Sequence, residues 1–248
     1  MKQAPEGENT LRSTLGVLTG IAGAIALAAV LNTTLWAGKA PRDIIAQEFD
    51  DSASGTVIRE RFATDYQAAI AAAPRDHALS LNERFDHSAA IAQTIRTKYS
   101  EFAGRANDVV LRDVITARAA LLRYVEEKKD GLSCARLFKE GSDFLRPTPD
   151  HIAEKMDDVF AAIMTAIAEG RDRPVNRKAV RQEDWGALAA ANRARGLSRQ
   201  ELDWLGEDAV HEEDCRSAII YFETLATLPG DAGERVRSYT VDAIASLS

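Results

Sequence analysis

The chain has 248 residues, of which 46% are hydrophobic and 28% are charged, a composition typical of globular proteins and too apolar for a disordered one. Its formal net charge of −7 argues against a general nucleic-acid-binding protein, which needs a basic surface to neutralise phosphates. Alanine is abundant, at 43 residues, and aromatic residues make up only 6%, which favours closely packed helices over β-sheets.

The N-terminal region contains one long uncharged segment. After a tail over residues 1–12, no charged side chain occurs from Ser13 to Gly38, and Leu15–Ala37 is a mostly apolar run. A helix over that run reaches about 34 Å, enough to cross a hydrocarbon core about 30 Å thick. We therefore predict a single transmembrane anchor over residues 13–38. The alternative is a cleaved signal peptide, although the run is longer than such segments usually are.

Four small residues lie four positions apart within the predicted anchor, namely Gly16, Gly20, Ala24 and Ala28. A stripe of this kind lets two helices approach closely in lipid, where packing drives association. It predicts pairing of the anchor with a second copy of the chain or with a partner helix, unless the stripe is a chance product of an alanine-rich segment. The charges on the two sides of the anchor are nearly balanced and do not decide its orientation.

Beyond the anchor, apolar residues repeat at helical spacing almost throughout, and no segment alternates for long enough to predict a strand. Ser80 and Glu83 have the spacing of a capping box at a helix start. The stripes Val110–Tyr124 and Ile152–Ala166 each repeat at spacings of four and three, and Gly170 is expected to end the second helix. Ser198-Arg199-Gln200-Glu201 predicts one more helix start.

The charged segment 171–184 is predicted to be an exposed linker. It contains five basic residues, namely Arg171, Arg173, Arg177, Lys178 and Arg181. The linker would separate a helical domain over residues 39–170 from a C-terminal helical segment over residues 185–248 that packs on the first. The predicted fold class is therefore all-α, with one transmembrane helix followed by a soluble domain of six to eight amphipathic helices.

The chain has two cysteines, Cys134 and Cys215, each near the start of a predicted helix. Behind an export-type segment, two cysteines are most simply explained as one disulfide bond, which forms in an oxidising compartment. The alternative is a pair of buried thiols in a cytosolic protein. We predict the disulfide, and with it a single-pass protein of the inner membrane whose C-terminal domain lies in the periplasm.

No motif in the sequence identifies a reaction. Glu207 and His211 have the spacing of one helix face, as have Glu83 and His87, but no established metal-binding pattern accompanies either pair. There is no P-loop, no dinucleotide-binding fingerprint and no nucleophile elbow. We therefore expect no metal site and no cofactor, and the catalytic residues, if the protein is an enzyme, are unknown.

The function expected from these features is that of a non-catalytic interaction or scaffold subunit of an envelope complex, with a protein partner in the cell envelope. Two alternatives remain. One is a periplasmic peptidoglycan enzyme that uses a buried carboxylate, and the other is a released periplasmic protein that binds a small ligand. A carboxylate with a raised pKa in a deep cleft would favour the enzyme.

Overall fold

The computed structural model describes residues 41–73, 81–141, 145 and 148–246, and 81% of these residues are helical. No strand occurs in this part of the chain, so the all-α class is confirmed there. The described helices begin with α2 (Pro41–Asp50), α3 (Ala53–Arg61), α4 (Ala63–Ala72), α5 (Leu81–Tyr99), the 3-10 helix η2 (Ser100–Arg105) and α6 (Asp108–Lys128). They continue with α7 (Gly131–Lys139), α8 (Asp150–Asp172), α9 (Gln182–Ala194), α10 (Arg199–Trp204), α11 (Asp214–Thr227) and α12 (Gly230–Ser246).

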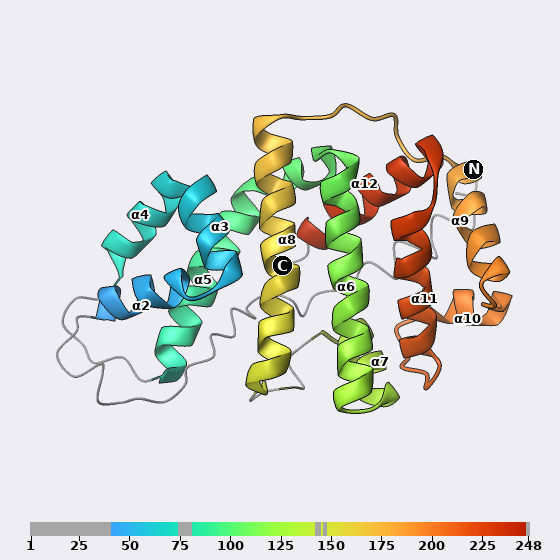
Figure 1. Cartoon of the computed structure of the whole chain (residues 1–248), viewed down its shortest axis with the longest axis horizontal. Helices are drawn as coiled ribbons and strands as arrows, with labels where there is room; N and C mark the ends of the chain where they lie inside the picture. The colour runs from blue at the N-terminus through green and yellow to red at the C-terminus, as the bar shows by residue number, and fades with distance from the viewer. Residues whose placement is uncertain (1–40, 74–80, 142–144, 146–147, 247–248) are drawn as a thin grey trace, which may run out of the picture.

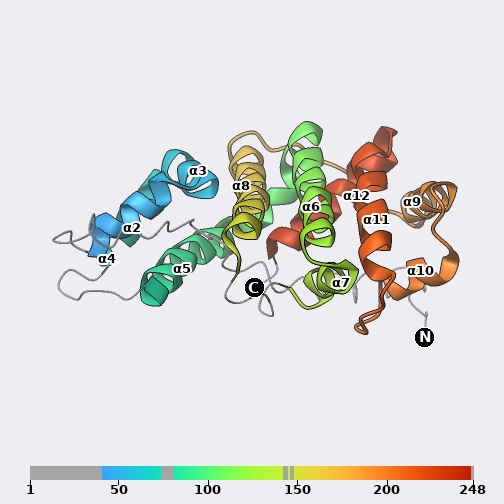
Figure 2. The ribbon, with the colours of Figure 1, turned by 60° about the horizontal axis from the view of Figure 1, so that its bottom comes forward.

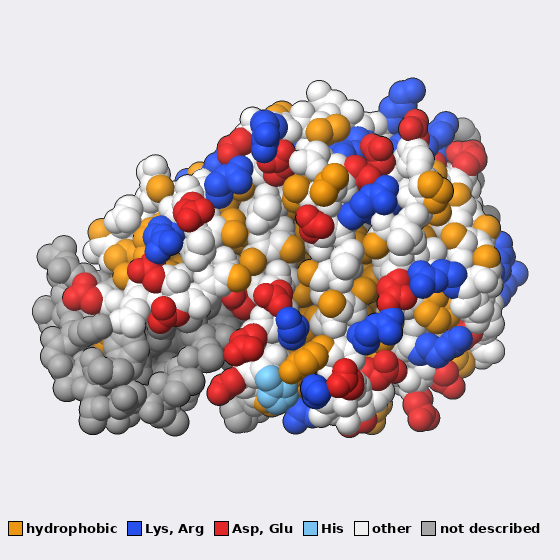
Figure 3. All heavy atoms as spheres, viewed as in Figure 1, with side chains coloured by type: hydrophobic (Ala, Val, Ile, Leu, Met, Phe, Trp, Pro, Cys, Tyr) orange, Lys and Arg blue, Asp and Glu red, His pale blue; other side chains and the backbone are white. Residues whose placement is uncertain are grey.

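The long helices α8, α6 and α11 stand side by side in the middle of the molecule (Figure 1). The short helices α2–α4 lie with α5 on the outer side of α8, and α9 and α10 lie beyond α11 (Figures 1 and 2). Helix α12 crosses behind α6 (Figure 1) and contacts both α6 and η2. Apolar side chains on the face shown in Figure 3 are scattered among charges of both signs.

The predicted apolar stripes form the centre of this core. Val114 and Leu121 of α6 are buried, as are Ile152, Met156 and Ile163 of α8. These stripes face one another because residues three and four positions apart share one side of a helix. The helical pattern read from the sequence is therefore confirmed for the two longest helices.

Gly170 does not end α8, contrary to the prediction, because the helix continues to Asp172. A Cβ atom on Gly170 would lie 1.9 Å from the carbonyl oxygen of Phe102 in η2. Gly104, at the other side of η2, lies similarly close to α12, since its Cβ would be 2.7 Å from the Ser238 carbonyl oxygen. The two glycines thus allow η2 to lie tightly between α8 and α12.

Cys134 and Cys215 form the predicted disulfide, with sulfur atoms 2.04 Å apart and Cα atoms 5.3 Å apart. The bond joins the first turn of α7 to the first turn of α11. Asp130 begins α7, because its side chain accepts a hydrogen bond from the backbone N–H of Ser133 at 2.6 Å. Both cysteines are buried in the core.

The described part of the chain contains more helices than the six to eight predicted, since α2–α12 are eleven α-helices. The difference arises from short elements such as α3 and α10, whose nine and six residues carry too few apolar positions for a visible stripe. The Ser198–Glu201 capping box is confirmed as the start of α10. Ser80 of the other predicted box lies outside the described residues.

Among the residues that the structure describes, no helix has the length and apolar character needed to cross a membrane. The predicted anchor over residues 13–38, with its stripe of Gly16, Gly20, Ala24 and Ala28, lies outside them.

Candidate functional site

A pocket of about 710 Å³ lies between η2, the segment that joins α8 to α9, and α12. This volume falls within the range of roughly 300–1,000 Å³ that is usual for ligand sites. Its wall includes Glu101 and Arg105 of η2, Lys178 and Arg181 of the joining segment, Trp185 of α9, and Arg235, Tyr239 and Asp242 of α12. Three stretches of chain that are far apart in sequence therefore form one concave surface.

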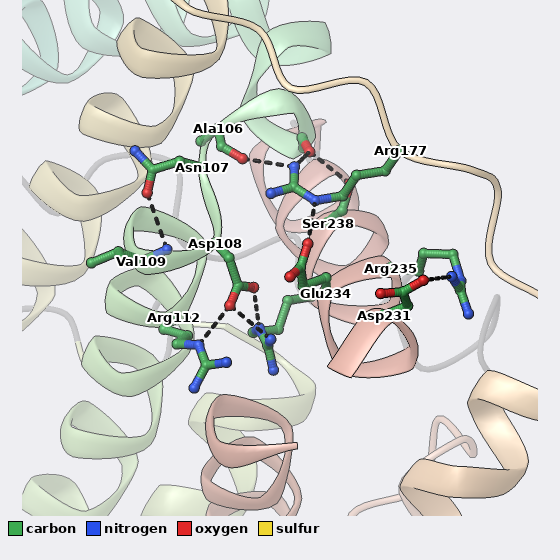
Figure 4. Close-up of polar contacts among 12 residues, drawn as sticks. Ala106, Asn107, Asp108, Val109, Arg112, Arg177, Asp231, Glu234, Arg235 and Ser238 are labelled. Carbon is green, nitrogen blue, oxygen red and sulfur yellow. Dashed lines mark hydrogen bonds and ion pairs between the residues drawn. The ribbon is translucent and has the colours of Figure 1, made fainter. Parts of the chain in front are cut away.

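The joining segment 173–181 contains no helix but is held in place by named contacts. The backbone N–H of Val175 donates to the Arg105 carbonyl oxygen at 2.8 Å. Arg177 extends from this segment, donates to the carbonyl oxygens of Gly104 and Ala106 at 3.3 and 2.7 Å, and lies 3.7 Å from the carboxylate of Glu234 (Figure 4). The predicted linker thus forms one wall of the pocket, and Arg177 joins it to both neighbouring elements.

The far end of this wall is fixed by Asp184, a buried residue in the first turn of α9. Arg235 of α12 binds both of its carboxylate oxygens, at 2.7 and 2.8 Å, and the backbone N–H of Arg181 donates to one of them at 2.9 Å. The hydrogen bonds from Arg235 hold the pKa of Asp184 at about 2. A bidentate buried pair of this kind fixes position as well as charge.

An aromatic pair lines the pocket between its charged parts. The rings of Trp185 and Tyr239 meet edge to face, with centroids 5.5 Å apart and an interplanar angle of 86°. Both residues are half-buried, so each leaves part of its surface available to a ligand. Such surfaces accept apolar or planar groups, and the neighbouring polar groups set the orientation of a ligand.

The remaining charges of the pocket are not neutralised by buried partners. Lys178 has no ion pair with a described residue, and Arg181 has only a contact of 3.9 Å with the exposed Glu183. On the opposite side, Glu101 and Asp242 both line the pocket. Desolvation raises the pKa of Asp242, the Gly104 backbone and the charge of Arg105 act against that shift, and the charge of Glu101 adds to it. The pocket therefore offers cations and carboxylates that have no buried ion-pair partner among the described residues.

The cysteines predicted as a disulfide lie outside this pocket, where they support the packing of α7 on α11. Of the histidine pairs, His211 lies 3.4 Å from Glu207 and stacks on Trp204 at a centroid distance of 4.5 Å. No group of three or more metal-ligating side chains occurs among the described residues.

The sequence revealed only part of this site. It singled out Arg177, Lys178 and Arg181 as a dense basic stretch, but as a linker and not as the wall of a pocket. Trp185 and Tyr239 were not recognised, because they are more than 50 positions apart and each could equally face a core. The sequence feature that could have pointed to the pocket is the position of Asp184 and Trp185 directly after the basic stretch.

Comparison with known proteins found no matching family model, no matching curated protein and no matching solved structure.

Proposed function

We propose that this chain is a non-catalytic recognition protein of the bacterial cell envelope, whose pocket engages a peptide segment of a partner protein. In this proposal residues 13–38 anchor the chain in the inner membrane, and residues 39–248 lie in the periplasm. The observation that carries the proposal is the pocket itself, in which free charges of both signs surround an aromatic pair.

The disulfide supports the proposed location. Stable disulfide bonds form in oxidising compartments, and the periplasm is one of them. Cys134 and Cys215 are 81 positions apart and join two different helices, so the bond crosslinks the fold over a long distance.

If residues 13–38 anchor the chain, alkaline carbonate should leave the full-length protein in the membrane pellet. A soluble product that starts near residue 40 would contradict the anchor.

The character of the pocket supports peptide recognition. Peptide segments combine charged groups, hydrogen-bonding backbone and apolar side chains at short intervals. The charged side chains of the pocket can pair with the charged groups of a peptide, its polar groups with the peptide backbone, and its aromatic pair with apolar side chains. The cations at Lys178 and Arg181 are exposed and long, which suits contact with a mobile carboxylate. Because Arg177 and Arg235 already have acidic or carbonyl partners, they hold the wall in shape instead of binding a ligand.

Site-specific photocrosslinking in intact cells tests the proposal. A photoreactive amino acid in place of Gln182, which lines the pocket, should give a discrete adduct with an envelope protein. The double reversal Lys178→Glu/Arg181→Glu should abolish that adduct. The same photoreactive residue at Ala120, on the exposed face of α6, is the matched control and should give none. Absence of an adduct at position 182, or an adduct that persists after the charge reversal, would contradict the proposal.

Asp242 supports a second candidate function, that of a peptidoglycan-cleaving enzyme. Asp242 and Glu101 line the same pocket as exposed side chains, and desolvation raises the pKa of Asp242, which suits a general acid in bond cleavage. Purified full-length protein should then release soluble fragments from cell-wall sacculi, and Asp242→Asn should remove that activity. Sacculi that stay intact at high protein concentration would rule this candidate out.

A further inference from the structure

The carboxylates of the pocket lie together at one end. A Cβ on Gly104 would lie 2.9 Å from the Cβ of Asp242, and the Gly104 backbone acts to lower the pKa of that carboxyl group. Glu101 lies three residues before Gly104 in the same 3-10 helix, whose repeat of about three residues puts both on one side. Arg105 is nearby, but its guanidinium packs over the Phe102 ring at 5.5 Å from the ring centroid. Arg177 also reaches the Gly104 carbonyl oxygen, but its charge is paired with Glu234, so Glu101 and Asp242 outnumber the one remaining cation, Arg105, here.

The free cations lie at the opposite end. The backbone of Arg181 hydrogen-bonds to Asp184, which pairs with Arg235 near the start of α12. Lys178 directly follows Arg177, which contacts Glu234 in the same turn of α12 (Figure 4). The backbone of Arg181 is thus held at the level of residue 235, and Lys178 lies three residues before it in the same segment. Asp242 lies two turns further along α12, a separation of roughly 10 Å at 1.5 Å per residue.

The aromatic pair lies between the two ends. Tyr239 is four residues after Arg235 and three before Asp242, so all three residues share one face of α12. Trp185, which meets Tyr239 edge to face, closes this middle part from the side of α9. The pocket is therefore dipolar, with an acidic end, an aromatic middle and a basic end.

An extended peptide advances about 3.3–3.6 Å per residue, so roughly 10 Å corresponds to three residues. We infer that the pocket binds the free amino end of a partner chain whose third residue is acidic. The terminal ammonium group lies at Glu101 and Asp242, the second side chain against Trp185 and Tyr239, and the third-residue carboxylate at Lys178 and Arg181. The inference rests on the proposed peptide recognition and adds to it the polarity, length and chemistry of the bound segment.

Calorimetric titration of the full-length protein in detergent with synthetic peptides tests this inference. The probe is the peptide Ala-Tyr-Asp-Ala-Ser-amide with a free amino group. Acetylation of that group is expected to weaken binding about tenfold, and so is replacement of the aspartate by asparagine, because each change removes one charge-assisted contact. Moving the aspartate to the fifth position should weaken binding by a similar factor.

Protein variants assign each end of the peptide. Glu101→Gln/Asp242→Asn should make the free and acetylated peptides bind equally while the preference for aspartate persists. Lys178→Ala/Arg181→Ala should remove the preference for aspartate over asparagine, while the free peptide still binds more tightly than the acetylated one. Arg199→Ala, an exposed cation of α10, is the matched control and should change neither preference. Circular dichroism of each variant establishes that the fold is retained.

The outcomes separate this inference from the proposal on which it rests. If the peptides bind with no effect of acetylation, and Lys178→Ala/Arg181→Ala still weakens them, peptide recognition stands and the amino-end inference is wrong. If no peptide binds, neither claim stands. A tenfold effect of acetylation that the Glu101→Gln/Asp242→Asn variant removes is the result that the inference predicts.

Discussion

Two arginines of the core, Arg118 and Arg237, are both fully buried but have different surroundings. Arg237 donates to Asp108 and to the carbonyl oxygens of Leu225 and Leu228 at 2.8 to 3.0 Å. No nitrogen of the Arg118 side chain has a hydrogen-bond partner in the part of the chain that the structure describes. Burial lowers the pKa of Arg118 to about 10. The same substitution should therefore have opposite effects at the two positions.

Arg118→Met is expected to stabilise the protein by roughly 1–4 kcal/mol, because it removes a buried charge that has no counter-charge among the described residues. Arg237→Met should destabilise it by about 3–5 kcal/mol, since it leaves the Leu225 and Leu228 carbonyl groups without their donor and Asp108 with Arg112 as its one remaining cation among the described residues. Urea unfolding measures both values. Equal destabilisation by the two substitutions would contradict this account of Arg118.

The buried pair of Asp184 and Arg235 predicts a pH dependence of stability. The pKa of Asp184 is about 2 in the folded chain, below its value of about 3.9 in an unfolded chain. A depressed folded pKa contributes stability that is present above the unfolded pKa and is lost as the pH falls through the folded one. The difference is worth about 2–3 kcal/mol at neutral pH.

Asp184→Asn should therefore be less stable than the wild type by at least about 2 kcal/mol at pH 7, and the gap should narrow from pH 4 towards pH 2. Urea unfolding at a series of pH values measures it. Other carboxylates titrate in both proteins. The difference in free energy of unfolding between the wild type and the variant therefore reports on Asp184 alone. A gap that stays constant over this pH range would contradict the assignment.

At the scale of elements, the position of η2 depends on the absence of a side chain in α8. Gly170→Ala should destabilise the fold by about 3 kcal/mol or more, because its Cβ would overlap the Phe102 carbonyl oxygen of η2. Gly186→Ala in α9 is the matched control. No atom lies within 4 Å of a Cβ there, so this substitution should stabilise the helix by roughly 0.5–1 kcal/mol. Thermal unfolding of both variants tests the contrast, which would fail if Gly170→Ala were neutral.

The sequence predicted the elements whose stability is local. The stripes of α6 and α8 each extend over about four turns, and the Ser198–Glu201 capping box is complete within four residues. The sequence misplaced the end of α8, because glycine is common both at helix ends and at close contacts between helices. Only the carbonyl group of Phe102, some 70 positions away, distinguishes these two roles for Gly170.

At the scale of the whole molecule, the disulfide joins α7 to α11 across 81 positions. Cys134→Ala/Cys215→Ala should lower the free energy of unfolding by about 4 kcal/mol, because the unfolded chain gains the entropy of the opened loop. Reduction of the wild type should loosen the C-terminal third first, seen as proteolytic cuts within residues 171–184 or 228–230. Unfolding curves that do not change on reduction would contradict this role.

The pocket could not be predicted from the sequence, because it depends on contacts between distant segments. Arg177 faces Glu234 and Asp184 pairs with Arg235, at separations of more than 50 residues. A basic stretch between two helices is usually solvated, and only these pairings make it the wall of a pocket. The disulfide, in contrast, was predictable, since two cysteines allow a single intramolecular pairing.

The central claim is that a peptide binds beside Trp185, and the emission of that residue tests it most directly. Trp36→Phe/Trp204→Phe leaves Trp185 as the single tryptophan of the full-length chain. Titration with Ala-Tyr-Asp-Ala-Ser-amide should change its fluorescence saturably, at the concentrations at which calorimetry detects binding, and Lys178→Ala/Arg181→Ala should weaken the response. Calorimetric binding without any change in Trp185 emission would place the peptide elsewhere and contradict the account.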